Sequence, residues 1–89
     1  MIRMFVRHDV ADYEKWRKAY DDFDSERSGM GVVGHAVYRS AVDGNNVTAT
    51  HDFESLEKAK AFIDSPRLRE AMEAAGVTSQ PDVWFTKPV

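Results

Sequence analysis

The histidines are the residues of this sequence that point most directly to chemistry. The chain has three of them, His8, His35 and His51, and it has no cysteine. An imidazole exchanges a proton near neutral pH, and it is also a common ligand of zinc, copper and iron. The three residues therefore indicate either acid/base chemistry or a metal site. Which of the two applies depends on the faces of the fold on which they lie.

His51 belongs to the segment "NNVTATHDF", residues 45–53. Strand alternation there places Val47, Ala49, His51 and Phe53 on one side and polar residues on the other. The apolar members indicate that the first side is buried. His51 is then either a core histidine with one hydrogen bond or a working group in a pocket.

The apolar periodicity along the chain predicts the elements that position these residues. An alternating pattern predicts strands, and a spacing of three and four residues predicts helices. Asp12, Ser55 and Ser65 are suited to be helix N-caps, and Gly76 is suited to end the last helix. The expected strands cover 2–8, 32–40, 46–53 and 82–87, and the expected helical regions run from 13 to about 27 and from 56 to 75.

The order β-α-β-β-α-β predicts a ferredoxin-like α+β fold in a single domain, residues 1–89. In this arrangement a four-stranded antiparallel sheet carries its helices on one face. The other face would leave valine and phenylalanine side chains in water. We therefore expect a homodimer in which two sheets pack against each other across a two-fold axis.

The turn between the second and third strands decides which histidines share a face. A two- or four-residue loop through residues 43–46 would pair even positions of one strand with odd positions of the other. His51 would then share the helix-covered face with Tyr38, and His35 would face the dimer partner. A three-residue loop with a bulge at Gly44 would instead bring His35 and His51 together.

Composition excludes several classes of partner. The net charge is −3 and the charged residues are interspersed without a basic stripe, so nucleic acid is not expected as a partner. No apolar run reaches the roughly 20 residues that span a bilayer, so no membrane partner is expected. The first residues lack the pattern of a signal peptide, and the chain has no cysteine to oxidise. These features predict a cytoplasmic protein.

Three stretches carry a resemblance to a known family: "HDVADYEKWRKAYDDF", "VYRSAVDGNNVTATHDFESLEKAKAFIDSPRLREAMEAAGV" and "PDVWFTKPV". With them the whole chain resembles the dimeric α/β barrel superfamily, and within it the small proteins similar to antibiotic biosynthesis monooxygenases and cyclases. The resemblance implies a homodimeric barrel with a pocket between each sheet and its own helices. It does not imply heme ligation, because the positions that match the iron-ligating histidine and the tryptophan of heme-degrading relatives are Phe62 and Phe53.

These observations lead to a functional hypothesis. The protein binds a small aromatic or polyketide-like ligand and oxygenates or cyclises it without a cofactor. We expect His51 to act as acid/base, Tyr38 to orient the substrate and His8 to assist. The substrate-binding residues would be the aromatic side chains and one arginine that could anchor a carboxylate or phenolate: Trp16, Tyr20, Phe53, Phe62 and Arg7.

Three alternatives stay open. A divalent transition metal could be bound by His8, His35 and His51, which requires all three rings on one face. The protein could be a non-catalytic dimeric ligand-binding or stress protein with structural histidines. The aromatic spacing of the first helix is also what core packing against a sheet requires, whatever the function.

Overall fold

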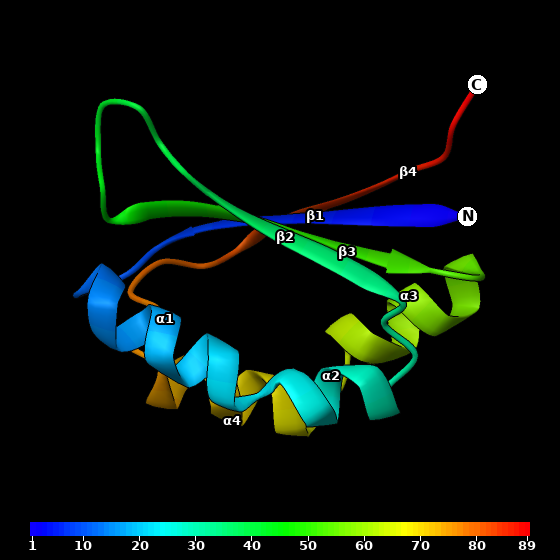
Figure 1. Cartoon of the computed structure of the whole chain (residues 1–89), viewed down its shortest axis with the longest axis horizontal. Coiled ribbons are helices and arrows are strands. Elements are labelled where there is room, and N and C mark those ends of the chain that lie inside the picture. Colours follow the sequence, from blue (N-terminus) through cyan, green and yellow to red (C-terminus); the bar gives the residue numbers. More distant parts are fainter.

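The computed structural model describes residues 1–89 and shows one sheet with all helices on one of its faces (Figure 1). The four strands form an antiparallel sheet in the order β2-β3-β1-β4, which confirms the predicted ferredoxin-like α+β fold. Each predicted helical region consists of two consecutive helices. The elements are β1 (Ile2–Asp9), α1 (Tyr13–Asp22), α2 (Asp24–Gly29), β2 (Gly34–Arg39), β3 (Asn46–Phe53), α3 (Leu56–Ile63), α4 (Pro66–Ala74) and β4 (Asp82–Thr86).

The helices begin at the side chains that the sequence indicates. The carboxylate of Asp12 accepts hydrogen bonds from the first free amides of α1, and Ser55 and Ser65 do the same for α3 and α4. These bonds satisfy amides that have no partner inside a helix. Gly76 ends the last helical region with a φ of 87°, a conformation that side chains disfavour. The caps thus set where each helix meets the sheet.

The first helical region is broken at Phe23, which ends α1 and precedes α2. The side chain of Phe23 is buried, as are Trp16 and Tyr20 on α1. The break lets α2 continue along the sheet at a new angle (Figure 1). It also brings Arg27, a charged residue, into the protein interior with 3% of its surface exposed.

The hydrophobic core consists of two clusters of buried side chains. The larger cluster joins the ends of β1 and β3 near α3 and α4, and the smaller one joins α1 to the other ends of the same strands. The larger contains Met4, Val6, Phe23, Val32, Phe53, Ala59, Phe62 and Leu68. The smaller contains Val10, Trp16, Tyr20, Val47 and Ala49. A sheet covered on one face buries its side chains in this way between the strands and the helices.

The pairing of β2 with β3 differs from the expected simple hairpin. His35 lies directly opposite His51, and Tyr38 lies opposite Thr48. Arg39 pairs with Val47, so the connecting residues 40–46 are odd in number and odd positions pair with odd positions. Gly44 does not have a positive φ, so the shift comes from the length of this loop and not from a glycine bulge. The prediction that His51 and Tyr38 share a face is therefore wrong.

The face of the sheet that carries no helix has a distinct set of side chains. Phe5 on β1 and Trp84 on β4 stack with their ring centroids 5.3 Å apart. Tyr38 lies on the same face with 58% of its surface exposed, and Trp84 has 43% exposed. Arg3 pairs there with Asp52 at 2.7 Å. The face is thus partly aromatic and partly ionic.

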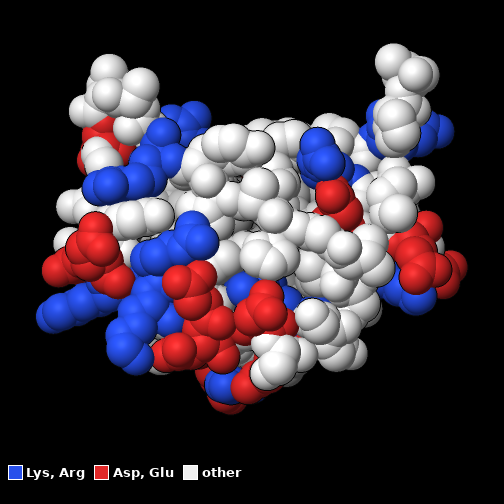
Figure 2. All heavy atoms as spheres, viewed as in Figure 1, with Lys and Arg blue, Asp and Glu red and all other residues white.

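The charged side chains are distributed mainly over the outer surfaces of the helices. Acidic and basic residues are interspersed over α1 and α2, while the surface around β2 is largely uncharged in this view (Figure 2). Charged residues four positions apart along α1 form ion pairs, namely Arg17 with Asp21 and Lys18 with Asp22. None of the helices has the length and apolar character required to cross a membrane.

Candidate functional site

A cavity of about 60 Å³ lies between the sheet and its helices. Its lining residues come from both core clusters, so the cavity lies at the boundary between them. Most of the lining is apolar or aromatic, and its large rings are those of Trp16, Tyr20, Phe23 and Phe62. The histidines and cations of the lining are His8, Arg27 and His51.

These three residues also hold the unpaired polar atoms of the protein interior. The Nδ1 atoms of His8 and His51 and the Nε atom of Arg27 are buried and have no hydrogen-bond partner. A buried polar group without a partner costs roughly 1–3 kcal/mol. All three atoms belong to residues that line the same cavity. This coincidence makes the cavity the candidate ligand site of the protein.

His51 projects from β3 with 6% of its surface exposed. Its ring lies 5.1 Å from the ring of Phe62 and 6.3 Å from that of Tyr20, measured between centroids. Burial lowers the pKa of His51 to about 3, and the positive charge of Arg27 contributes in the same direction. His51 is therefore a neutral imidazole at physiological pH, with a free nitrogen beside the cavity.

His8 lies near the end of β1 and is 5% exposed. Its ring meets the edge of Trp16 with the centroids 5.8 Å apart. Burial lowers the pKa of His8 as well, so its ring is also neutral near pH 7. In the sheet His8 lies opposite Val47, and His51 lies opposite Met4. The two histidine rings are therefore on the same face, but the position opposite His8 is four residues from His51 along β3.

Arg27 is a member of the site that the sequence did not indicate. Its Nη1 donates to the backbone oxygen of Tyr20 at 2.7 Å, and its guanidinium carbon lies 3.7 Å from the centroid of the Tyr20 ring. Its Nη2 reaches Oδ1 of Asp24 at 3.4 Å. The side chain is thus held in place by a carbonyl and an aromatic face, while Nε remains free.

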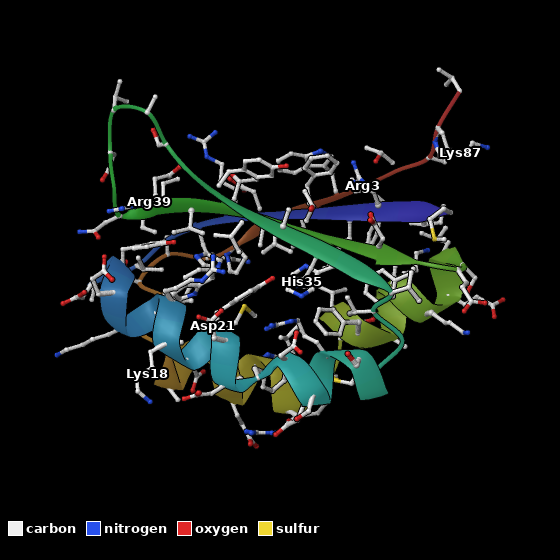
Figure 3. All side chains as sticks on the ribbon, viewed as in Figure 1. Arg3, Lys18, Asp21, His35, Arg39 and Lys87 are labelled. Atoms are coloured by element: carbon white, nitrogen blue, oxygen red, sulfur yellow. The ribbon has the colours of Figure 1, made fainter.

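His35 takes part in a second polar arrangement, at the outer side of Tyr20. The Tyr20 hydroxyl lies 2.8 Å from Nδ1 of His35, and Nε2 of His35 lies 3.2 Å from Oδ1 of Asp24. Burial raises the pKa of Tyr20, which keeps its hydroxyl protonated. Figure 3 shows His35 on β2 between the sheet and the helices, whereas Lys18 on α1 points away from the sheet. The expectation that His35 faces the dimer partner is wrong.

Three of the predicted site residues do not reach the cavity. Tyr38 and Arg7 project from the opposite face of the sheet, where the Nε atom of Arg7 donates to Asn46 at 3.0 Å. Phe53 is fully buried and packs against Phe62 with the centroids 5.4 Å apart, but it does not line the cavity. The odd-numbered loop places Tyr38 outside, since one residue reverses the face of every side chain on a strand.

The other predicted residues come together at the cavity. His51, His8, Trp16, Tyr20 and Phe62 all line it, and their roles in catalysis or binding stay predictions. All three histidines lie on the helix-covered face, as a metal site would require. No group of three or more histidine, aspartate or glutamate side chains is close enough to hold a metal ion, however. His8 is separated from His51 by four strand residues, or about 13 Å.

The arrangement suits the binding of a flat molecule that carries an acidic hydroxyl. Aromatic and aliphatic side chains would contact its faces. The two neutral imidazoles can accept or donate hydrogen bonds, and the guanidinium can stabilise negative charge. In surroundings of low polarity such charge stabilisation is stronger than in water.

Comparison with solved structures supports the fold assignment. A candidate antibiotic biosynthesis monooxygenase from Bordetella bronchiseptica matches with a TM-score of 0.83 at 17% identity, over 99% of this chain and 96% of that one. SnoaB, a cofactor-independent oxygenase from Streptomyces nogalater, matches with a TM-score of 0.77 at 13% identity, over 98% and 91% of the two chains. A similar candidate monooxygenase from Caulobacter crescentus matches with a TM-score of 0.77 at 15% identity, over 99% and 89%.

The chain thus has the fold of antibiotic biosynthesis monooxygenase-like proteins, as its sequence resemblance implies. At these identities the likeness concerns the fold and not the reaction. The sequence matches no family model and no curated protein.

Proposed function

We propose that this protein binds a small aromatic or polyketide-like molecule in the cavity and oxygenates or cyclises it without a bound cofactor. The observation that carries the proposal is the set of unpaired atoms on His8, Arg27 and His51 at one apolar cavity. The monooxygenase-like fold adds support, because SnoaB is a cofactor-independent oxygenase on the same fold. The substrate would carry an acidic hydroxyl or an activated carbon next to a carbonyl.

In the proposed reaction His51 exchanges a proton with the substrate and His8 assists by hydrogen bonding. A histidine with a pKa of about 3 is a weak base when the cavity is empty. A substrate that becomes negative beside it changes this, because an adjacent negative charge raises the pKa of an imidazole. Proton transfer and ion-pair formation then take place together at Nδ1.

The oxygenation would follow from the electron-rich substrate anion. Dioxygen adds to the carbanion carbon of an activated methylene group, and the resulting peroxide breaks its O–O bond. One oxygen atom stays on the substrate as a carbonyl and the other leaves as water, taking up both hydrogens of the methylene group. The balance needs no external reductant, since the substrate supplies the electrons. The apolar lining would keep bulk water away from the anion.

We also propose that the chain works as a homodimer. The helix-free face presents the stacked Phe5 and Trp84 together with the exposed Tyr38. A second copy of this face could cover these rings across a two-fold axis. Tyr38 and Arg7 would then lie at the dimer interface and not at the substrate.

A dioxygen electrode tests the proposed activity directly. Small naphthalenediols and 1,3-diketones are suitable probes at pH 7, and the product would be identified by mass spectrometry. We expect oxygen consumption that requires folded protein, and a loss of roughly 10²-fold in rate for His51→Ala and His51→Gln. Thr48→Ala is the matched control, because Thr48 lies on the same strand with its side chain on the other face. Unchanged turnover in folded His51 variants would contradict the assignment of His51.

One observation favours a second candidate function. The cavity of about 60 Å³ is small beside the roughly 300–1,000 Å³ of typical ligand pockets. In a non-catalytic dimeric ligand-binding or stress protein the space between sheet and helices would be filled largely by side chains, and the histidines would be structural. If a folded, ligand-binding protein consumes no dioxygen and converts none of the probes, this second function is the better description.

A further inference from the structure

Arg27 is unusual because its charge is buried without a full counter-charge. Only 3% of its surface is exposed, and its closest carboxylate is Asp24 at 3.4 Å. The side chain of Asp24 is 61% exposed, and the same Oδ1 atom also faces His35 at 3.2 Å. An exposed, shared carboxylate at this distance compensates a buried guanidinium only in part.

Arg27 has unused hydrogen-bonding capacity and is one of the residues that line the cavity. Nη1 and Nη2 have partners, but Nε is buried without one, and the residue lines the cavity. Stacking on Tyr20 holds the guanidinium plane in place. A planar, pre-positioned donor of this kind recognises carboxylates and other oxyanions well.

The neighbouring groups cannot neutralise this charge themselves. His51 and His8 are neutral, and neither is an acid that could supply a negative charge. Their free Nδ1 atoms are suited to bind the polar part of a ligand. The rest of the lining is apolar or aromatic and adds no negative group.

We infer that the cavity selects its ligand as an anion, a small aromatic carboxylate or phenolate whose charged oxygen is held by Nε of Arg27. The aromatic body of the ligand lies against Trp16 and Phe62, and its polar substituents meet the histidines. This inference rests on the proposed function in one respect, since it takes the cavity to be the ligand site. It adds the charge state of the ligand and the residue that anchors it.

Benzoate and benzamide test the inference, because they have nearly the same shape and differ in charge. Binding to the full chain would be followed by titration calorimetry at pH 7. The arginine Nε–H signals would be followed in proton–nitrogen correlation spectra. We expect benzoate to bind about tenfold or more tightly than benzamide, in line with the strength of charge-assisted hydrogen bonds. The signal of Arg27 should shift on addition of benzoate, while that of Arg3, on the other face, should not.

Variants separate anion binding from a structural role of Arg27. Arg27→Gln should weaken benzoate binding about tenfold or more and weaken benzamide binding much less, because only benzoate carries a negative charge. Arg69→Gln removes an exposed arginine and is the matched control, expected to bind both probes like the wild type. If Arg27→Gln does not fold, the selectivity and the Arg27 signal of the wild-type protein decide the question.

Several results would overturn the inference. These are equal affinities for the two probes, no binding of benzoate at millimolar concentration, an unmoved Arg27 signal, or unchanged benzoate binding by folded Arg27→Gln. The proposed function fails separately: anion binding through Arg27 without turnover of any probe keeps the inference and contradicts the oxygenase. Turnover of a neutral probe by a protein that does not prefer benzoate to benzamide would support the oxygenase and contradict the inference about Arg27.

Discussion

The hydroxyl of Tyr20 and Nδ1 of His35 lie 2.8 Å apart and join α1 to β2. The other ring nitrogen of His35 lies 3.2 Å from the carboxylate of Asp24 at the start of α2. With Nε2–H donating to that carboxylate, Nδ1 is left as the acceptor for the Tyr20 hydroxyl. The three residues thus connect an exposed carboxylate with a side chain that lines the cavity.

This connection predicts the tautomer of His35. When the His35 ring is neutral, its proton should reside on Nε2. Nδ1 should then show the nitrogen chemical shift of an unprotonated, hydrogen-bonded imidazole nitrogen. Asp24→Asn should weaken this preference, since a neutral amide is a poorer acceptor than a carboxylate. Nitrogen-15 spectra of histidine-labelled protein measure it. A proton found on Nδ1 of His35 in the wild type would contradict the predicted tautomer.

The lowered pKa of His51 predicts that the protein loses stability in acid. Its pKa falls from 6.5 in the unfolded chain to about 3 in the folded one, so the folded state disfavours the protonated ring. The stabilisation is complete above pH 6.5 and declines as the pH falls toward 3, by up to about 1.4 kcal/mol per pH unit. His8 acts in the same direction.

Urea unfolding at pH 7 and pH 4.5 measures this effect. Between these values the free energy of unfolding of the wild type should fall by roughly 2–3 kcal/mol more than that of His51→Gln, which has no group that titrates in this range. The paired comparison cancels the contribution of the carboxylates. A parallel loss of stability in both proteins would show that His51 titrates normally.

The stacked Phe5 and Trp84 predict the behaviour of the open sheet face. Trp84→Lys should turn a dimeric protein into a monomer, because it places a charge among the aromatic rings of the proposed interface. Light scattering coupled to size-exclusion chromatography measures the mass. Lys18→Ala on the outer face of α1 is the control and should leave the dimer intact. A wild type of 10.1 kDa at micromolar concentration would refute the homodimer.

The cap of α1 predicts a stability effect away from the cavity. The Asp12 side chain accepts from the amides of Glu14 and Lys15, so Asp12→Ala should lower the free energy of unfolding by about 1 kcal/mol. Asp22→Ala removes a carboxylate that makes only an exposed ion pair with Lys18, and it should cost less than about 0.5 kcal/mol. Equal effects of the two substitutions in urea unfolding would argue against the cap.

The sequence predicted the fold well because local signals carry it. Strand alternation, helix spacing and the caps at Asp12, Ser55 and Ser65 all depend on neighbours in the chain, and they gave β3 its observed bounds. The break at Phe23 was missed, since the segment that forms α2, "DSERSG", has no apolar residue whose spacing could indicate a new helix.

The site was predicted only in part, for two physical reasons. The faces of β2 depend on the parity of a polar loop, and several turn geometries satisfy the same residues. Arg27 lies in the segment "SERSG", where a charged residue is normally solvent-exposed, and only the tertiary fold shows its stacking on Tyr20. The only sign in the sequence that Arg27 is buried was weak: this arginine lies on the same side of the helical region as Phe23.

The odd-numbered loop of residues 40–46 also bears on how such a protein can evolve. Deleting one residue there, such as the fully exposed Val42, would rotate β2 so that its two rows of side chains exchange places. Tyr38 and Ala36 would enter the interior, while His35 and Val37 would leave it. A single codon lost from a surface loop would thus exchange the side chains that β2 presents to the helices, and with them the contact of His35 with the cavity residue Tyr20, without altering any residue of the sheet.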